Sequence, residues 1–250
     1  MEVFNNPSKT IVACNSRLAP YLEREIRQLG FAVRRTFATG VELEATVNDC
    51  IRLNLNLRCA NQVRYSLIAF RAKNPDELYA TVTGLPWESL IADDGYVSVT
   101  STVRTPTVTT PLFANVKVKD AIADRIKRVK GRRPDSGPEL DRAVVYLYWQ
   151  DDRAELFLDT SGESLTRHGY RKHPGKAPMQ ETLAAGVVMA TAWDGKTPFI
   201  NPMCGSGTLA IEAALLATNR APGLLRMNYA FMHFLGYDET VFFAERRQLK

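Results

Sequence analysis

The chain has 250 residues and a formal net charge of +5; 45% of its residues are hydrophobic and 24% are charged. This length fits one large or two ordinary domains, and the composition excludes low-complexity and repeat architectures. The first ten residues are polar, and the longest weakly polar stretch, residues 183–193, is far shorter than the roughly 20 residues of a membrane span. We therefore expect a cytoplasmic protein without a membrane segment.

Residues 1–62 have the pattern of a small strand–helix–strand–strand–helix unit. Apolar residues at helical spacing follow Ser16, a favourable N-terminal cap, and Gly30 is a favourable helix end. In chain order, the expected elements are a strand at 10–14, a helix from Ser16 to Gly30, strands at 31–35 and 41–45, and a helix at 48–61.

Residues 63–161 form a second predicted unit. Its expected elements are a strand at 63–69, a helix after Pro75, a strand at 96–104, a turn at 105–111, a helix at 116–129 and strands at 144–148 and 154–158. Asp151 and Asp152 make a tight hairpin between the last two strands plausible. Arg125 falls inside the apolar stripe of the 116–129 helix, so it must snorkel or find a carboxylate.

Residues 162–179 have the composition of a basic linker, with three glycines and two prolines. Beyond it, residues 180–250 predict a helix at 180–193, a strand at 197–201 and a helix at 208–218. A strand, a glycine turn and a helix in this order are typical of the opening of an α/β nucleotide-binding domain.

Positive charge is concentrated in two segments. Residues 117–133 hold eight Lys or Arg and two Asp, a net charge of +6, and residues 164–176 hold four more cations and no acid. The rest of the chain therefore has a net charge of −5. Such segregation is typical of a surface that binds a polyanion. The alternatives are a solvated charged face for the first segment and a flexible linker for the second.

The four cysteines and three histidines predict no metal site. None of the cysteines forms a C-x-x-C pair, and the histidines complete no zinc-binding pattern. We expect buried free thiols at Cys14, Cys50, Cys59 and Cys204.

The sharpest motif is Asn201-Pro202-Met203-Cys204-Gly205-Ser206-Gly207-Thr208, between a predicted strand and a predicted helix. Glycines at 205 and 207 let the backbone turn tightly and approach a ligand. A phosphate loop is excluded, because no Lys follows Gly207. A dinucleotide site remains open, since Gly205, Gly207 and Ala210 have the required spacing, and so does a plain strand-to-helix turn.

Residues 201–214 (NPMCGSGTLAIEAA) resemble the first motif of the THUMP-containing guanine-N2 RNA methyltransferases. Residues 158–185 (LDTSGESLTRHGYRKHPGKAPMQETLAA) resemble the junction into that family's catalytic domain, and the Ala221-Pro222-Gly223 turn also fits. The first half resembles the family more loosely, through element order and basic residues. The most similar branch is the bacterial enzymes that modify 23S ribosomal RNA.

The resemblance implies an α+β N-terminal part, made of a ferredoxin-like subdomain (1–62) and a THUMP RNA-binding domain (63–161), followed by the start of an α/β Rossmann-like methyltransferase domain (180–250). It implies S-adenosylmethionine as cofactor and RNA as partner, ribosomal or transfer. The implied cofactor contacts are Asn201, Met203, Cys204, Gly205, Gly207, Thr208, Glu181 and Thr182, with a capped helix start as the alternative for the last two.

The RNA contacts follow from the basic segments and from the implied junction. They are Lys117, Lys119, Lys127, Arg128, Lys130, Arg132, Arg133, Arg167, Arg171 and Lys172, with His168 and His173 beside them. His168 stands where we expect an Arg before Gly169-Tyr170, which weakens a phosphate contact there.

The family's catalytic N-P-P-[YF] motif is absent from these 250 residues. Its backbone oxygens would accept the N–H bonds of the guanine amine while its aromatic ring stacks on the base. We therefore assign no catalytic residue, and Asp238 and Glu239 come too early for the ribose-binding acid. We expect a truncated chain that is inactive alone.

Three alternatives remain. One is a stand-alone RNA-binding module with a vestigial cofactor loop, another is a transfer-RNA guanine-N2 methyltransferase, and the third is a nicotinamide-dependent oxidoreductase supported only by the glycine spacing. The sequence does not decide the target nucleotide or the oligomeric state.

Overall fold

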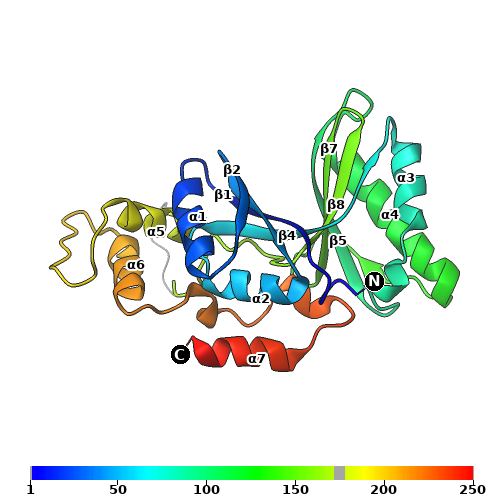
Figure 1. Ribbon diagram of the computed structural model, residues 1–250. Coiled ribbons are helices and arrows are strands. Elements are labelled where there is room, and N and C mark those ends of the chain that lie inside the picture. The colour runs from blue at the N-terminus through cyan, green and yellow to red at the C-terminus, as the bar shows by residue number, and fades with distance from the viewer. Residues whose placement is uncertain (1, 172–177, 250) are drawn as a thin grey trace. The chain divides into compact units, whose positions relative to one another are not determined.

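The computed structural model describes residues 2–171 and 178–249 (Figure 1). The predicted RNA contact Lys172 and its neighbour His173 lie outside the described residues. The chain forms two compact units, each gathered from separate parts of the sequence. Unit 1 comprises Met1–Ser8, Arg64–Glu163 and Asn228–Asp238; unit 2 comprises Lys9–Val63, Ser164–Met227 and Glu239–Lys250.

The first part of unit 2 is a small sheet with two helices. Its elements are β1 (Ser8–Cys14), α1 (Ala19–Gln28), β2 (Val33–Phe37), β3 (Gly40–Ala45), α2 (Val47–Asn56) and the start of β4 (Ala60–Arg71), and the strand order is β2-β3-β1-β4. Thr46 caps α2 by accepting the N–H of Asp49, whose carboxylate accepts the N–H of Thr46 in return. Leu22, Ile26 and Ile51 are fully buried, as their helical spacing predicts.

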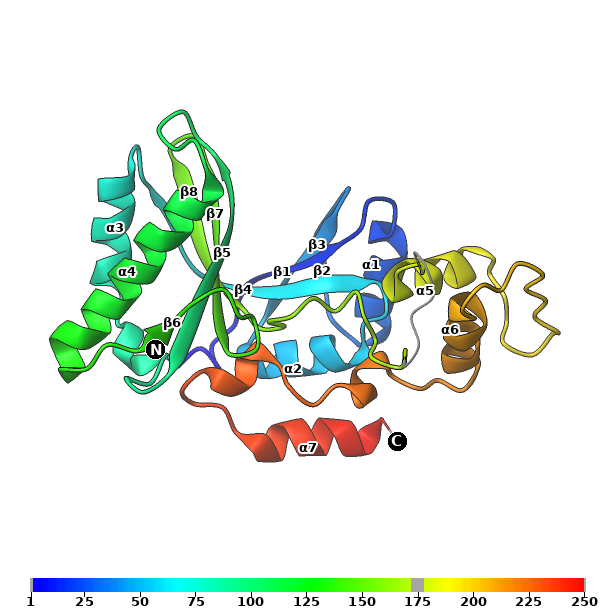
Figure 2. The ribbon, with the colours of Figure 1, turned by 180° about the vertical axis from the view of Figure 1, so that it is seen from behind.

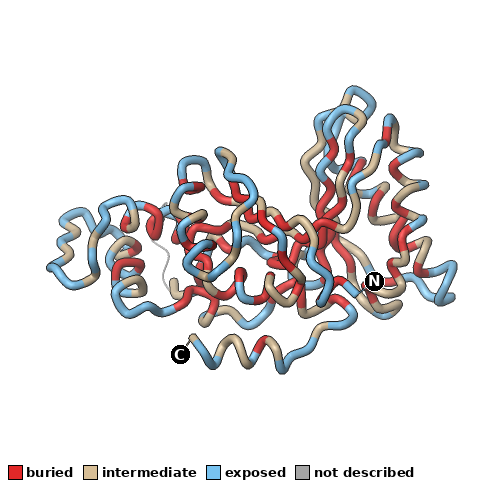
Figure 3. The backbone as a smooth tube through the Cα atoms, in the orientation of Figure 1, coloured by how far each residue is buried: buried red, intermediate tan, exposed pale blue. Residues whose placement is uncertain are grey.

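Unit 1 is a sheet with helices packed against it. The rest of β4 continues into the order β4-β8-β7-β5-β6, with β5 (Tyr96–Arg104), β6 (Asp135–Ser136), β7 (Ala143–Gln150) and β8 (Arg153–Asp159). The helices are α3 (Pro75–Gly84), η1 (Trp87–Ser89), α4 (Pro111–Lys130) and η3 (Ala230–His233). Figure 2 shows α3 and α4 side by side, and α4 packs against β5. Residues 143–147 of β7 and 156–159 of β8 are buried (Figure 3).

The described residues of unit 2 include four further helical elements. They are α5 (Glu181–Ala190), α6 (Thr208–Ala217), η2 (Pro222–Leu225) and α7 (Glu239–Gln248). Helices α5 and α6 pack against each other. Arg246 of α7 donates to the carbonyl oxygens of Gly223, Leu224 and Arg226, and so ties α7 to η2.

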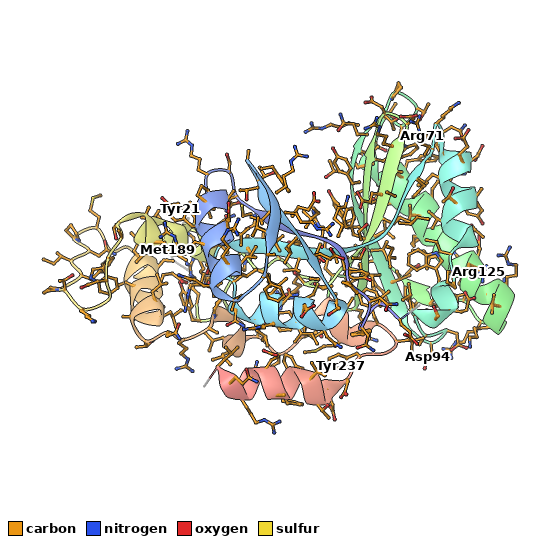
Figure 4. All side chains as sticks on the ribbon, viewed as in Figure 1. Tyr21, Arg71, Asp94, Arg125, Met189 and Tyr237 are labelled. Carbon is orange, nitrogen blue, oxygen red and sulfur yellow. The ribbon has the colours of Figure 1, made fainter. Side chains whose placement is uncertain are left out.

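Several local predictions are confirmed. Strand β5 has the predicted bounds, and β7 and β8 form an antiparallel hairpin around Asp151 and Asp152. Asp151 has a positive φ of 53°, which an Asp tolerates in a tight turn. Arg125, which Figure 4 labels, finds a carboxylate. Its Nε and Nη2 donate to Glu88 at 3.0 and 2.6 Å.

Three local predictions are wrong. Residues 197–201 form no strand, because a strand needs a neighbouring ladder and none pairs with this segment in the described part of the chain. The N-cap of α1 is Leu18 rather than Ser16, since Pro20 favours the first turn and sets the helix start. Cys204 is exposed, unlike the three buried cysteines, because it lies in the exposed turn of residues 202–206.

Among the described residues, no helix is long and apolar enough to cross a lipid bilayer.

Candidate functional site

The glycine turn before α6 has the backbone that its sequence predicts. Gly205 and Gly207 have φ values of +52° and +78°, in the left-handed region that favours glycine. Gly207 N–H donates to Cys204 O at 2.8 Å and closes the turn. A Cβ atom added to either glycine would meet no atom within 4 Å, so open space lies above both. The turn therefore presents its backbone to the surroundings.

The N-terminus of α6 follows this turn directly. Gly207 is its N-cap and supplies no side-chain cap, so the first N–H groups of α6 have no side-chain acceptor there. Such a helix start favours a negatively charged group, which the carboxylate of a methionine moiety would supply. Asn201 Nδ2 is buried without a hydrogen-bond partner. These features fit S-adenosylmethionine. The turn is also accessible, since Met203 within it is 90% exposed.

Three residues hold α6 in place along its length. Arg171 Nη2 donates to Thr208 Oγ1 at 2.9 Å, His168 Nδ1 lies 2.8 Å from Glu212 Oε1, and Arg58 Nη2 donates to Arg220 O at 2.7 Å and Leu215 O at 3.3 Å. These contacts lie at the start, middle and end of the helix. The position of the glycine turn therefore depends on residues 58, 168 and 171.

Glu181, at the start of α5, binds the junction segment. Its Oε2 accepts the backbone N–H groups of His168 and of Gly169, the latter at 3.2 Å, and its Oε1 lies 3.6 Å from Arg171 Nε. Thr182 is fully buried, and its hydroxyl has no hydrogen-bond partner. Of the two predicted cofactor contacts on α5, Glu181 is thus engaged with protein groups, whereas Thr182 retains a free hydroxyl.

His168, Glu181 and Glu212 lie close enough to one another to suggest a metal site, with one potential ligand atom from each within 4.8 Å of the others. Some of their atoms are, however, engaged in hydrogen bonds: Glu212 Oε1 contacts the imidazole directly, and Glu181 Oε2 accepts two backbone N–H groups. The arrangement is that of a hydrogen-bonded network. Burial and the carboxylate of Glu212 raise the pKa of Tyr170, which adjoins it.

The predicted basic face on α4 is partly neutralised. Lys117 pairs with Asp76 at 3.2 Å, Lys119 lies 3.6 Å from Asp120, and Arg133 binds both Asp120 and Asp124 at 2.8 and 3.0 Å. Within the described ranges, four exposed cations of this segment have no such ion pair: Lys127, Arg128, Lys130 and Arg132. These four, called the α4 end patch below, are therefore available to a polyanion.

The two described junction cations differ in environment. Arg167 is exposed, whereas the Arg171 side chain is only 16% exposed. Arg171 Nη2 donates to the hydroxyl of Thr208 and to the carbonyl oxygen of Met179. Sequence reasoning missed Glu25, Arg58 and Glu212, which are buried and polar. Their sequence signal is weak, because a single charged residue does not reveal a partner far away in the sequence.

Three family descriptions match successive parts of the chain. The RlmL ferredoxin-like domain matches residues 9–64, the THUMP domain matches residues 72–159, and the RMKL-like methyltransferase domain matches residues 168–249. The chain is 37% identical over 227 residues to a ribosomal RNA large subunit methyltransferase K/L of Allochromatium vinosum, covering 89% of the chain and 31% of that protein. The protein of the same name from Methylococcus capsulatus is 38% identical over 225 residues, covering 88% and 30%.

Solved structures agree with these matches. A predicted N6-adenine-specific DNA methylase from Listeria monocytogenes superposes with a TM-score of 0.86 at 30% identity, covering 98% of this chain and 64% of the other. SMU.472, a candidate methyltransferase solved in complex with SAH, superposes with a TM-score of 0.85 at 25% identity and the same coverage. The chain spans about a third of the length of the curated relatives it matches. It belongs to the family that joins an RlmL ferredoxin-like domain and a THUMP domain to an RMKL-like methyltransferase domain.

Proposed function

We propose that this chain is the RNA-binding and cofactor-loop part of an S-adenosylmethionine-dependent RNA methyltransferase, acting on guanine N2 of 23S ribosomal RNA. The open glycine turn at the uncapped start of α6 is the observation that carries the proposal. Support comes from relatives that are named ribosomal RNA large subunit methyltransferases and from a similar structure complexed with SAH.

In this proposal, each part has a distinct task. The cofactor supplies an electrophilic methyl group on a sulfonium. Gly205 and Gly207 bring the backbone close to it, and the N–H groups at the start of α6 bind its carboxylate. The remaining contacts would come from Asn201, Met203, Cys204, Thr208 and Thr182. Glu181 would act one step away, by holding the junction segment against Arg171.

RNA would be held through its phosphates by the THUMP part of the chain. The α4 end patch supplies four exposed cations on one helix end and the loop after it. Neutralising phosphates releases counterions, so binding should weaken steeply as salt rises. Arg167 would make a separate phosphate contact in the junction segment. A cytoplasmic location would suit a ribosomal RNA substrate.

The Listeria structure is named as an adenine-specific DNA methylase, which makes DNA the competing substrate. RNA is favoured because the chain contains a THUMP domain and because its curated relatives are named for ribosomal RNA. The decisive assay offers unmodified 23S RNA, transfer RNA and duplex DNA to a form of the protein that also carries an N-P-P-[YF] motif. Methyl incorporation at guanine in 23S RNA supports the proposal, whereas incorporation into DNA alone contradicts it.

The 250 residues themselves provide a second test. Titration with SAH and with NADH in parallel should give binding of SAH only; binding of NADH instead would favour an oxidoreductase. Since the N-P-P-[YF] motif is absent, we propose that this chain alone transfers no methyl group. RNA binding without any SAH binding would favour a stand-alone RNA-binding module.

A further inference from the structure

The ferredoxin-like match and most of the methyltransferase match lie together in one compact unit. Residues 9–63 of the first match belong to unit 2, as do residues 168–227 and 239–249 of the second. Residues 9–63, called the ferredoxin-like segment below, therefore fold with the helices that follow the junction. Figures 1 and 2 show α1 of this segment beside α5, and the two helices are in contact.

Helix α6 ends in a well-defined turn. Thr218 is its C-cap, and Asn219 follows in the left-handed region with a φ of 49°. The N–H of Asn219 donates to Leu216 O at 3.1 Å, and the N–H of Arg220 donates to Leu215 O at 2.9 Å. These two bonds make a Schellman motif. Because the last carbonyl groups of a helix carry partial negative charge, this end of α6 favours a cation.

The cation at this end of α6 comes from the ferredoxin-like segment. Arg58 Nη2 donates to Arg220 O at 2.7 Å and to Leu215 O at 3.3 Å, and Arg58 is only 7% exposed. Glu25 fixes the backbone at this position by accepting the N–H groups of Arg58 and Cys59. A buried guanidinium that is fixed at its backbone and bonded to two carbonyl oxygens holds the C-terminal end of α6 in place.

The same segment also contacts α5, which packs against α6. Leu18 lies so close to Gly186 of α5 that a Cβ atom added to Gly186 would clash with Leu18 Cδ2. Near the end of α5, Cys59 Sγ lies 3.7 Å from Met189 Sδ. The ferredoxin-like segment therefore contacts both helices of the methyltransferase match that surround the glycine turn in the sequence.

We propose that the ferredoxin-like segment supports the cofactor turn, and that Arg58 is the positioning residue through which it acts on α6. This helix has ten residues, so it is about 15 Å long, and the open glycine turn lies at its other end. Because a helix is a rigid element, a shift at its C-terminal end also moves its first N–H groups. The identity of the ligand at those groups rests on the proposed function; the support of α6 does not.

Two variants of Arg58 in the 250-residue chain test this role. Arg58→Met removes the cation and its hydrogen bonds. Arg58→Lys should fold, because it keeps a positive charge beside the buried Glu25 and Glu212, but its ammonium on a shorter stem reaches the two carbonyl oxygens less well. We expect SAH affinity, measured by calorimetry, to fall about tenfold in Arg58→Met and about threefold in Arg58→Lys. Arg52→Met, at an exposed position of α2, is the matched control and should leave SAH affinity unchanged.

NMR of the backbone amides of Gly205 and Gly207 shows whether the turn itself moves. Both signals should shift in the two Arg58 variants and stay in place in Arg52→Met. If Arg58 only stabilises its surroundings, its loss should lower the melting temperature without moving signals at the far end of α6. Unmoved glycine signals in folded Arg58→Lys would therefore overturn the proposal, whatever the change in stability.

The outcomes separate this proposal from the proposed function. Shifted glycine signals together with weaker SAH binding support both. Shifted signals in a chain that binds no SAH, with or without the substitutions, support the role of Arg58 and contradict the cofactor site. The affinity for structured RNA should be equal in all these variants. A loss of RNA affinity with unmoved glycine signals would assign the ferredoxin-like segment to RNA binding and reject its role as a support.

Discussion

The carboxylate of Glu25 holds the backbone of Arg58. Its Oε1 accepts the N–H of Arg58 at 2.9 Å and its Oε2 accepts the N–H of Cys59 at 3.1 Å, and all three residues are buried. This contact fixes the chain where α2 leads into β4, and it therefore places the carbonyl of Arg58 that His168 contacts.

Glu25→Ala should destabilise the protein strongly. The substitution leaves two buried N–H groups without an acceptor, at about 1–3 kcal/mol each, so we expect a loss of about 2–4 kcal/mol in the free energy of unfolding if water partly replaces the carboxylate. Chemical denaturation measures it. Glu23→Ala on the same helix is the control, and its loss should be clearly smaller because Glu23 contacts Arg27 and Thr36 near the surface. Equal losses would contradict a structural role of Glu25.

The Arg125–Glu88 pair should make unit 1 sensitive to acid. Its hydrogen bonds to Arg125 lower the pKa of Glu88. A lowered carboxyl pKa adds stability above the unfolded value of about 4.3, and this contribution disappears as the pH falls through the folded value. Arg125→Gln should therefore lower the melting temperature at pH 7, and the difference from the unaltered chain should shrink at pH 3. A constant difference between the two pH values would contradict the ion pair.

Elements with a local signal could be predicted from the sequence. The strand at 96–104 and the Asp151-Asp152 turn are set by neighbouring residues, and both appear at the predicted positions. The strand predicted at 197–201 was wrong because a strand depends on a partner elsewhere. Likewise, α1 begins next to Pro20 and not at the predicted cap Ser16, because proline favours the first turn of a helix.

The candidate site also contains some features that the sequence predicts and others that it does not. The positive φ of Gly205 and Gly207 follows from residue type, and the sequence predicts it. The contacts of His168 do not follow, because Glu212 and Arg58 lie 44 and 110 residues away. A basic linker was the natural interpretation of residues 162–179, yet His168 is 4% exposed. A buried polar pair between distant segments leaves no periodic signal.

Gly207→Ala should impair the cofactor turn without a steric clash. The added Cβ meets nothing within 4 Å, so the cost is that of a left-handed backbone, about 1–2 kcal/mol. We expect a modest loss of stability and a much larger loss of SAH affinity by calorimetry. Gly84→Ala is the matched control, because that glycine also has open space and no positive φ. Unchanged SAH affinity in Gly207→Ala would count against the assigned turn.

Cys204 should be the first thiol to react. It is exposed, whereas burial raises the pKa of Cys14 to about 11 and raises that of Cys59 further. Since the thiolate is the nucleophile, iodoacetamide at pH 8 should label Cys204 well before the buried Cys14, Cys50 and Cys59, as measured by mass spectrometry. SAH should slow this labelling if the cofactor lies against the turn. Labelling of Cys204→Ser at the remaining thiols gives the background rate.

The α4 end patch should bind RNA better than the ion-paired cations of the same helix region. A triple variant, Lys127→Ala, Arg128→Ala and Lys130→Ala, removes three exposed cations without an ion pair in the described part of the chain. We expect lower affinity for structured RNA and a salt slope that falls by about 0.7–0.9 for each phosphate that the variant no longer neutralises.

The control removes the same charge from the neighbouring residues. Lys117→Ala, Lys119→Ala and Arg133→Ala together also remove three positive charges, but these side chains already face Asp76, Asp120 and Asp124. If the end patch touches phosphate, the control should lose less affinity and keep most of its salt slope. If net charge alone attracts RNA, both triple variants should weaken binding equally, and a local contact at the end of α4 would be rejected.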